Sequence, residues 1–317
     1  MQNKIKGVIY GVFVGDALGT TYEFRKANTI KLPSQLNITG KGPFNVAKGQ
    51  VTDDSEMTLA LLYSIIKKGK YDKEDVAKAY IRWLQSEPAD NGVTTARALE
   101  EAKNYKDVVN NSIVYNQDSW SNGFLMRISP LAIIGLNMSD KKLNKIIRDE
   151  VRITHSNINC FYMAKLYVHM IKYIIMGGKN YLEKALEIIK QDNYESKLEI
   201  IDIVTRAQKT PYFTHFYGRA YNKRIEPDGE MMGFSWVSLQ ISFYVLYNCK
   251  SYESAMREII KLGGDTDTNC AIAGAFMGAK FGYNKIPKRW LKTILQAKYD
   301  RPKEFKIDGK KLKQILN

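Results

Sequence analysis

Two short acidic segments hold the residues best suited to catalytic chemistry. The first is Thr52-Asp53-Asp54 and the second is Asp265-Thr266-Asp267-Thr268. Carboxylates that are packed together repel one another and resist joint ionisation unless a cation compensates their charge. Ligand sets made only of oxygen suit Mg²⁺, Mn²⁺ or Ca²⁺, whereas zinc prefers cysteine and histidine. This many carboxylates predicts two divalent cations, which together could grip neighbouring oxygens and position a water.

Each acidic segment also has a simpler explanation, because each directly precedes a run with helical periodicity. Thr or Asp at the N-cap of a helix accepts hydrogen bonds from free backbone N–H groups, which contributes about 1 kcal/mol. Asp53 and Glu56 even have the spacing of a capping-box variant. A cap needs only one oxygen-bearing side chain, however, and the surplus of Asp and Thr favours cation binding.

The second segment fits a rival pattern, the DxDxT motif of haloacid-dehalogenase-like phosphatases. In those enzymes the motif follows a hydrophobic strand near the start of a Rossmann-like domain. Here it follows a helical run and Gly263-Gly264 near the end of the chain. The context therefore argues against a phosphatase.

The elements that must position these segments are helices. Apolar residues recur at i, i+3 or i+4 and i+7, while the alternation typical of strands is scarce. The clearest runs span 75–85, 140–153, 162–176, 181–189, 236–247 and 252–262. The polar, glycine-bearing stretches 33–50, 88–94 and 209–232 are typical of loops, and we expect 209–232 to be mobile. Without a repeat or a shift in composition, we expect residues 1–317 to form a single compact all-α domain.

Glycines spaced by four mark two further helices. The first helix carries Gly7, Gly11, Gly15 and Gly19, and a late one carries Gly274, Gly278 and Gly282. Residues four apart share one face of a helix, and each helical glycine costs about 1 kcal/mol relative to alanine. We therefore expect both helices to pack closely at the centre of the fold and to bring the two acidic segments together.

Composition and charge narrow the class of protein. A chain of 317 residues with 44% hydrophobic residues can bury a full core without disulfides. Three widely spaced cysteines (Cys160, Cys249 and Cys270) argue against a cysteine zinc site and favour a reducing, cytoplasmic location. No apolar stretch is long enough to span a bilayer. The net charge of +15 forms no long basic block, which favours a solvated surface and an anionic substrate, with nucleic acid left open.

Taken in order, the motifs of this chain resemble the ADP-ribosylglycohydrolase family. The strongest matches are GDALGTTYEF (15–24), GQVTDDSEMTLAL (49–61) and GGDTDTNCAIAGAFMGAKFG (263–282). Weaker matches are GVTTARAL (92–99), SNGFLMRISPLA (121–132), Thr154-His155, GFSWVSL (233–239) and IPKRWL (286–291). Each motif alone is weak, but the ordered set is highly specific and covers nearly the whole chain.

The resemblance implies an all-α fold around a dinuclear centre of Mg²⁺ or Mn²⁺. The implied metal ligands are Thr52, Asp53, Asp54, Asp265, Asp267 and Thr268. The implied catalytic residues are Glu23, Asp53 and Asp265, with Glu23 as a ligand or a general acid/base. The implied contacts to ADP-ribose are Asn122, Gly123, Arg127, His155 and Phe234. A structural role would equally explain His155, and helix packing is the simpler explanation for Phe234.

The resemblance also implies a reaction, hydrolysis of the glycosidic bond between ADP-ribose and a modified group. We expect a monomer that acts on ADP-ribosylated protein, with arginine as the acceptor. Serine and nucleic-acid adducts are alternative substrates. A catalytically inactive relative that binds ADP-ribose or has a structural role is a further alternative, but the intact Asp and Thr positions argue against it.

Overall fold

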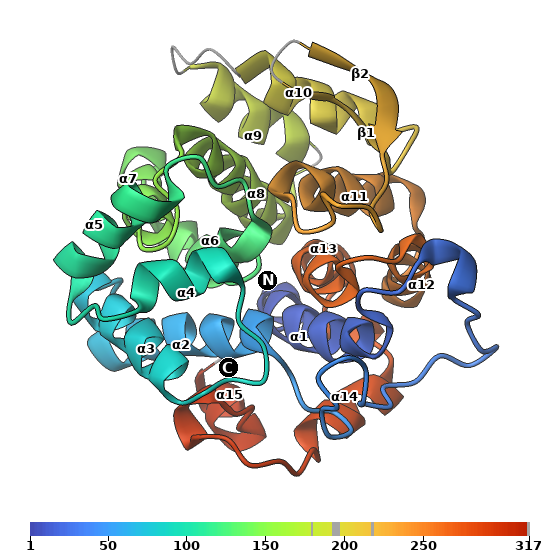
Figure 1. The fold of residues 1–317 in the computed structure, drawn as a ribbon, viewed down its shortest axis with the longest axis horizontal. Helices are drawn as coiled ribbons and strands as arrows, with labels where there is room; N and C mark the ends of the chain where they lie inside the picture. Colours follow the sequence, from blue (N-terminus) through green and yellow to red (C-terminus); the bar gives the residue numbers. More distant parts are fainter. Residues whose placement is uncertain (179, 192–196, 217–218, 316–317) are drawn as a thin grey trace.

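The computed structural model describes residues 1–178, 180–191, 197–216 and 219–315, and there nearly all of the regular secondary structure is helix (Figure 1). The α-helices are α1 (Gln2–Gly19), α2 (Asp53–Lys68), α3 (Lys73–Gln85), α4 (Val93–Leu99), α5 (Tyr105–Asn116), α6 (Pro130–Ile134), α7 (Asp140–Val151), α8 (Ile158–Met176), α9 (Tyr181–Lys190), α10 (Lys197–Arg206), α11 (Ser235–Asn248), α12 (Tyr252–Leu262), α13 (Thr266–Phe281), α14 (Lys288–Leu295) and α15 (Gly309–Ile315). Short 3₁₀ helices include η1 (Thr20–Tyr22), η3 (Asn122–Phe124) and η6 (Lys303–Phe305). The prediction of an all-α fold is confirmed, and each of the six predicted runs corresponds to one helix. None of the helices in these ranges is both long enough and apolar enough to cross a membrane.

Helices α1 and α13 lie side by side at the centre of the molecule (Figure 1). Glycines line the contact between them. A Cβ added to Gly11 would lie 2.2 Å from the carbonyl oxygen of Gly274, and one added to Gly7 would lie 2.1 Å from that of Gly278. Because both separations are far below van der Waals contact, only glycine lets the two backbones approach this closely. The predicted close packing is confirmed, except that Gly282 ends α13 with φ of 84° instead of continuing its stripe.

Helices α2, α8, α11 and α12 pack around the central pair. Two buried tyrosines connect these surrounding helices to the central pair by hydrogen bonds. The hydroxyl of Tyr167 in α8 donates to the carbonyl of Ile272 in α13 at 2.9 Å, and that of Tyr252 in α12 donates to the carbonyl of Gly11 at 2.5 Å. Buried apolar side chains from Val8 to Leu312 belong to one continuous cluster, so the ends of α1, α2 and α13 rest on a common core.

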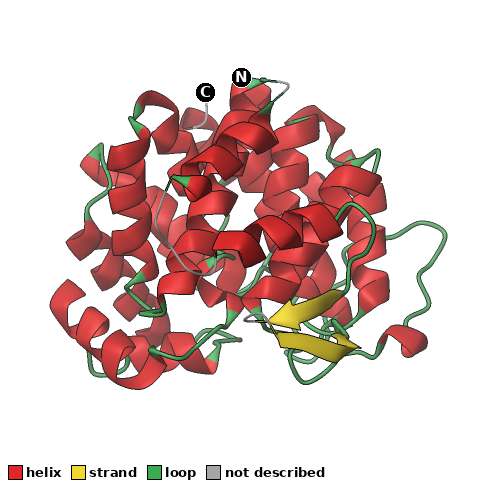
Figure 2. Ribbon diagram, turned by 90° about the horizontal axis from the view of Figure 1, so that it is seen from above, coloured by secondary structure: helices red, strands yellow, loops and turns green. Residues whose placement is uncertain are grey.

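The stretch 209–232 contains a hairpin and is not simply the predicted loop. Strand β1 (Phe213–Phe216) pairs antiparallel with β2 (Arg219–Ile225), which forms the yellow element of Figure 2. Phe213 and Ile225 pair at its base and are buried, and the ring of Phe213 lies 5.8 Å from that of Trp236 in α11. Packing of the base on α11 therefore anchors the hairpin. Residues 217–218 of this stretch lie outside the described residues.

Candidate metal centre and catalytic cavity

A buried aspartate of α1 holds the start of α2. The carboxylate of Asp16 accepts hydrogen bonds from the backbone N–H groups of Thr52 (3.0 and 3.1 Å) and Ser55 (3.1 Å). The hydroxyl of Thr52 donates to the same carboxylate at 2.9 Å. Asp16 therefore caps α2 from a neighbouring helix and fixes the first acidic segment against α1.

The residue at the N-cap position of each acidic segment does not use its side chain as a helix cap. Thr52 and Asp265 stand at the N-cap positions of α2 and α13, but neither side chain makes a capping hydrogen bond. Glu56 does not complete a capping box, because its carboxylate binds Trp83 and Arg301. Capping therefore does not explain these segments. The phosphatase alternative also loses support, because helix α12, and not a strand, precedes the second segment.

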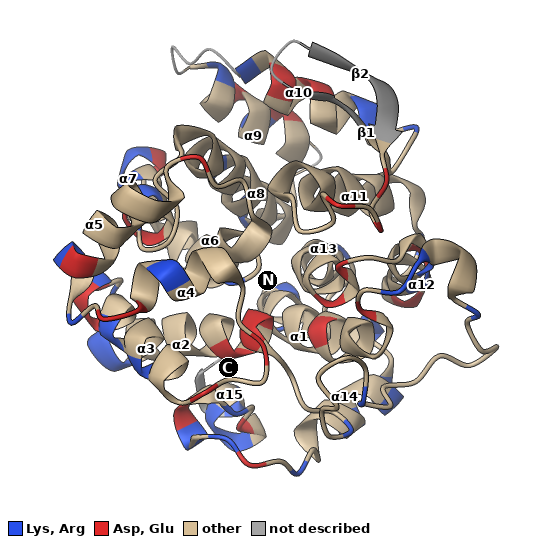
Figure 3. Ribbon diagram, viewed as in Figure 1, with Lys and Arg blue, Asp and Glu red and all other residues tan. Residues whose placement is uncertain are grey.

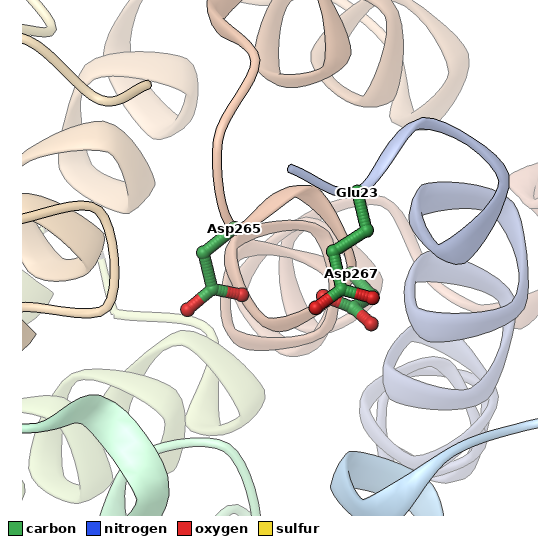
Figure 4. A group of neighbouring side chains, drawn as sticks. All are labelled: Glu23, Asp265 and Asp267. Atoms are coloured by element: carbon green, nitrogen blue, oxygen red, sulfur yellow. The ribbon is translucent and has the colours of Figure 1, made fainter. Parts of the chain in front are cut away.

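Glu23 and the second acidic segment converge on one point. The carboxylates of Glu23, Asp265 and Asp267 offer oxygens that all lie within 4.8 Å of one another (Figure 4). Glu23 reaches this point because the chain turns back after α1, where the N–H of Phe24 donates to the carbonyl of Gly264 at 2.8 Å. Gly264 has φ of 73°, in the left-handed region that glycine adopts readily.

Three carboxylate oxygens at this centre are buried without a hydrogen-bond partner. They are Oε2 of Glu23, Oδ1 of Asp54 and Oδ2 of Asp267. A buried acceptor with no donor costs about 1–3 kcal/mol and needs an explanation such as a bound ion. No histidine or cysteine joins the cluster in the described part of the chain. The oxygen donors therefore fit a hard cation such as Mg²⁺ or Mn²⁺.

Burial and mutual repulsion make the carboxylates of this centre resist ionisation. Burial, followed by the charges of Asp90 and Asp267, raises the pKa of Asp53 well above its usual range. Burial also raises the pKa of Asp267, and burial together with the charge of Asp267 raises that of Glu23. A divalent cation would offset this repulsion, because it becomes the largest local charge in the site.

A cavity of about 340 Å³ opens over this centre. Its described lining contains Glu23, Asp53, Asp90, Asp265 and Thr268 but no lysine, arginine or histidine. Figure 3 shows the same contrast, with acidic segments on α1, α2 and α13 toward the middle and most basic residues further out. Thr52, Asp54 and Asp267 are buried and do not line the cavity.

Two residues of the predicted ADP-ribose loop lie at the cavity, and one lies behind it. The side-chain amide of Asn122 donates to Asp265 at 2.7 Å and so holds that carboxylate in place. Gly123 lines the cavity itself. Arg127 is fully buried and does not line the cavity, because its guanidinium donates to the carboxylate of Glu150 (3.0 Å) and the carbonyl of Gly123 (2.7 Å). The structure thus places Arg127 beneath the Gly123 turn, and its contact with ADP-ribose stays a prediction.

His155 and Phe234 also lie outside the lining of this cavity. His155 is buried, and its Nε2 lies 2.8 Å from the hydroxyl of Ser121, which does line the cavity. Burial, followed by the charge of Arg127, lowers the pKa of His155 to about 3, so the ring is neutral. Phe234 is buried at the start of α11, with its ring 5.8 Å from that of Trp120. His155 therefore contacts the cavity wall through Ser121, while Phe234 packs against Trp120, and the contacts of both rings with ADP-ribose stay predictions.

Two carboxylates of the site lie outside the set predicted from the sequence. Asp16 belongs to the matched motif GDALGTTYEF, and a lone carboxylate on an otherwise apolar helix face is the signal that could have singled it out. Asp90 belongs to the stretch 88–94, which offers no such signal because its polar residues are typical of a loop. Burial, followed by the charge of Asp265, raises the pKa of Asp90 to about 6.

Comparisons with known proteins agree with this fold. The family model described as ADP-ribosylglycohydrolase matches residues 1–312. The ADP-ribosyl-dinitrogen reductase glycohydrolase of Rhodospirillum rubrum is 27% identical over 98% of this chain and 96% of its own. An ADP-ribosylarginine hydrolase of Serratia proteamaculans is 25% identical over 93% of this chain and 76% of its own. A solved structure of an ADP-ribosylglycohydrolase-related protein complex is similar, with a TM-score of 0.72 and 26% identity over 92% of each chain. The chain therefore belongs to the ADP-ribosylglycohydrolase family and is a hydrolytic enzyme.

Proposed function

We propose that this enzyme releases ADP-ribose from ADP-ribosyl-arginine on proteins and depends on two divalent cations of the Mg²⁺ or Mn²⁺ class. The observation that carries the proposal is the cavity whose described lining holds four carboxylates and no basic side chain. A site of this kind attracts cations, both metal ions and the guanidinium of an arginine acceptor. The relative from Serratia proteamaculans, which is named for ADP-ribosylarginine, supports the same acceptor.

The metal ions would be held between the starts of α2 and α13. The oxygen donors are Thr52, Asp53, Asp54, Asp265, Asp267 and Thr268, with Glu23 as a further donor beside the second segment. Bound cations of this class orient ribose hydroxyls and lower the pKa of a coordinated water. The unpartnered oxygens of Glu23, Asp54 and Asp267 are the structural support for this ligand set.

The chain's own residues would orient the reactants and move protons. Hydrolysis breaks the bond between the anomeric carbon of the distal ribose and the acceptor nitrogen, and it joins that carbon to a water oxygen. Glu23 or a cavity-facing aspartate, Asp53 or Asp265, would accept the proton that the water loses. The acceptor nitrogen takes up a proton as it leaves, and Asp90 on the cavity wall would stabilise the resulting guanidinium. Asn122 keeps Asp265 in position through its 2.7 Å hydrogen bond.

The charge of the cavity separates the three candidate acceptors. A guanidinium gains from Asp90, the one lining carboxylate outside the proposed metal-ligand set, whereas a serine hydroxyl is neutral and gains little. A nucleic-acid acceptor would bring further negative phosphates close to Asp90, whose charge the proposed metal ligation does not use. Although the whole chain carries a net charge of +15, none of that excess lines this cavity in the described residues.

The proposal is tested by measuring free ADP-ribose released from arginine- and serine-linked substrates with Mg²⁺, with Mn²⁺ and with EDTA. We expect metal-dependent release from the arginine adduct and a loss on the order of 100-fold or more in Asp265→Ala. Asp118→Asn, which changes an exposed carboxylate close in sequence to Asn122, is the matched control and should keep wild-type activity. Absence of release from folded, metal-loaded protein, or a preference for serine adducts, would refute the assignment.

A further inference from the structure

A buried arginine near the end of the chain joins two parts of the catalytic cavity. The side chain of Arg301 is 7% exposed. Its guanidinium donates to both carboxylate oxygens of Glu56 at 2.8 and 2.7 Å, and to the hydroxyl of Ser86 at 2.9 Å. It also donates to the backbone carbonyls of Ser86 (2.6 Å) and Glu87 (3.2 Å). Arginine has five N–H donors in a rigid planar fork, so these five contacts use the full set.

One partner of Arg301 is Glu56, which is fixed close to the first acidic segment. Glu56 is 2% exposed and lies in the first turn of α2, three residues after Asp53. The indole N–H of Trp83 donates to the same carboxylate at 2.8 Å. Asp16 holds the start of this helix from α1. Glu56 is therefore a rigid anchor for Arg301.

The other partners lie at the start of a cavity wall. Ser86 and Glu87 begin the connection 86–92 between α3 and α4, and its last residues, Asp90, Asn91 and Gly92, line the cavity. Glu87 has φ of 51°, a region that costs a non-glycine residue of order 1–3 kcal/mol. Because Pro88 follows, the backbone of Glu87 would otherwise favour an extended conformation. Arg301 donates to the carbonyls of both Ser86 and Glu87, which lie on either side of this strained backbone position.

We propose that Arg301 is a positioning residue. It fixes the cavity wall formed by residues 90–92 against the first acidic segment and thereby sets how the acceptor is held. The inference rests on the proposed function, because Asp90 is taken to face the leaving guanidinium. Without Arg301, Glu87 can relax and carry residues 90–92 away from their present place. The acidic segments stay in place, because Asp16 and Asn122 hold them without help from Arg301.

Arg301→Lys tests the proposal, with Arg82→Lys as its matched control. Lysine keeps the charge but lacks the planar fork that binds Glu56 and both carbonyls together. We expect kcat/KM for the arginine adduct to fall on the order of 10- to 100-fold, because small displacements of a reacting group cost this much. Affinity for Mn²⁺ should stay at the wild-type value. Arg82 also links α3 to the C-terminal segment, through Glu304, but both side chains are nearly half exposed, so its replacement should change neither quantity.

A double-mutant cycle separates positioning from simple loss of stability. If Arg301 acts by placing Asp90, then Asp90→Asn costs much less activity in the Arg301→Lys background than in the wild type. If Arg301 only stabilises the fold, the two effects on kcat/KM multiply, and the proposal is overturned. Glu56→Gln, which weakens the same bridge from α2, should reproduce the behaviour of Arg301→Lys.

Amide hydrogen exchange provides a readout that does not depend on activity. Exchange at residues 86–93 should rise in Arg301→Lys and stay at the wild-type rate in Arg82→Lys, while α13 remains protected in both. Unchanged exchange at 86–93 in folded Arg301→Lys overturns the inference. If the wild type releases no ADP-ribose, the proposed function fails, but the exchange result still decides whether Arg301 holds this wall.

Discussion

At the scale of single residues, the site depends on side chains that support the carboxylates as much as on the carboxylates themselves. Asp16 caps α2, Asn122 orients Asp265, and Arg127 lies beneath Gly123. Each of these contacts joins residues far apart in sequence, except for the local bond from Arg127. The types and spacing of the acidic residues predict a cation site, but such long-range partners become visible only in the fold.

Asp16→Asn should weaken both the fold and the metal site. The two carboxylate oxygens of Asp16 accept from the N–H groups of Thr52 and Ser55, and asparagine replaces one of these oxygens with a donor. A buried donor left without an acceptor costs about 1–3 kcal/mol, so we expect a lower Tm and weaker Mn²⁺ binding. Asp72→Asn is the control, because a single oxygen of Asp72 caps α3 and asparagine caps equally well. Equal effects of the two changes on Mn²⁺ binding would contradict the role given to Asp16.

At the scale of elements, the glycine seam shows which features a sequence pattern can predict. Glycine every fourth residue in two helices indicates a close approach, because no other residue allows it, and α1 and α13 meet along that stripe. The hairpin in 209–232 was not predictable in the same way, because its polar residues obscure the strand pattern and packing on α11 anchors it. The connection 86–92 was not predictable either, since its backbone carbonyls bind Arg301, which is more than 200 residues away in sequence.

Gly11→Ala should destabilise the protein much more than helix propensity alone suggests. The added Cβ would lie 2.2 Å from the carbonyl oxygen of Gly274, and backbone atoms of two packed helices have little room to move. We expect the free energy of unfolding to fall by at least about 3 kcal/mol, at the upper end of overpacking effects. Gly178→Ala is the control, because a Cβ there meets no atom closer than 3.8 Å. Denaturant unfolding measures both, and a Gly11→Ala variant as stable as Gly178→Ala would rule out a tight seam.

At the scale of the whole molecule, the distribution of charge links the site to global stability. The chain carries a net charge of +15, while acidic segments of α2 and α13 lie toward its centre (Figure 3) and carboxylates from both line the cavity there. The composition therefore predicts the sign of the surface charge, but it does not reveal that acidic residues gather in the interior. Burying like charges is costly, so without a cation the centre opposes the folding that brings its residues together.

Stabilisation by Mn²⁺ should therefore increase with pH. Burial and repulsion raise the pKa values of Asp53, Asp267 and Glu23 in the folded chain above the values of about 4 that these groups have when unfolded. A group with a raised folded pKa contributes stability below its unfolded pKa and loses it as the pH rises toward the folded value. The metal-free protein should thus lose stability as the pH rises from about 4 to neutrality. Over the same range protons compete less with the metal for its ligands.

We expect saturating Mn²⁺ to raise Tm more at pH 7.5 than at pH 5, and Asp53→Asn combined with Asp267→Asn to flatten this dependence. An increase in Tm that is equal at both pH values, or that also occurs with NaCl at matched ionic strength, would show that the buried carboxylates are not the groups that bind the metal.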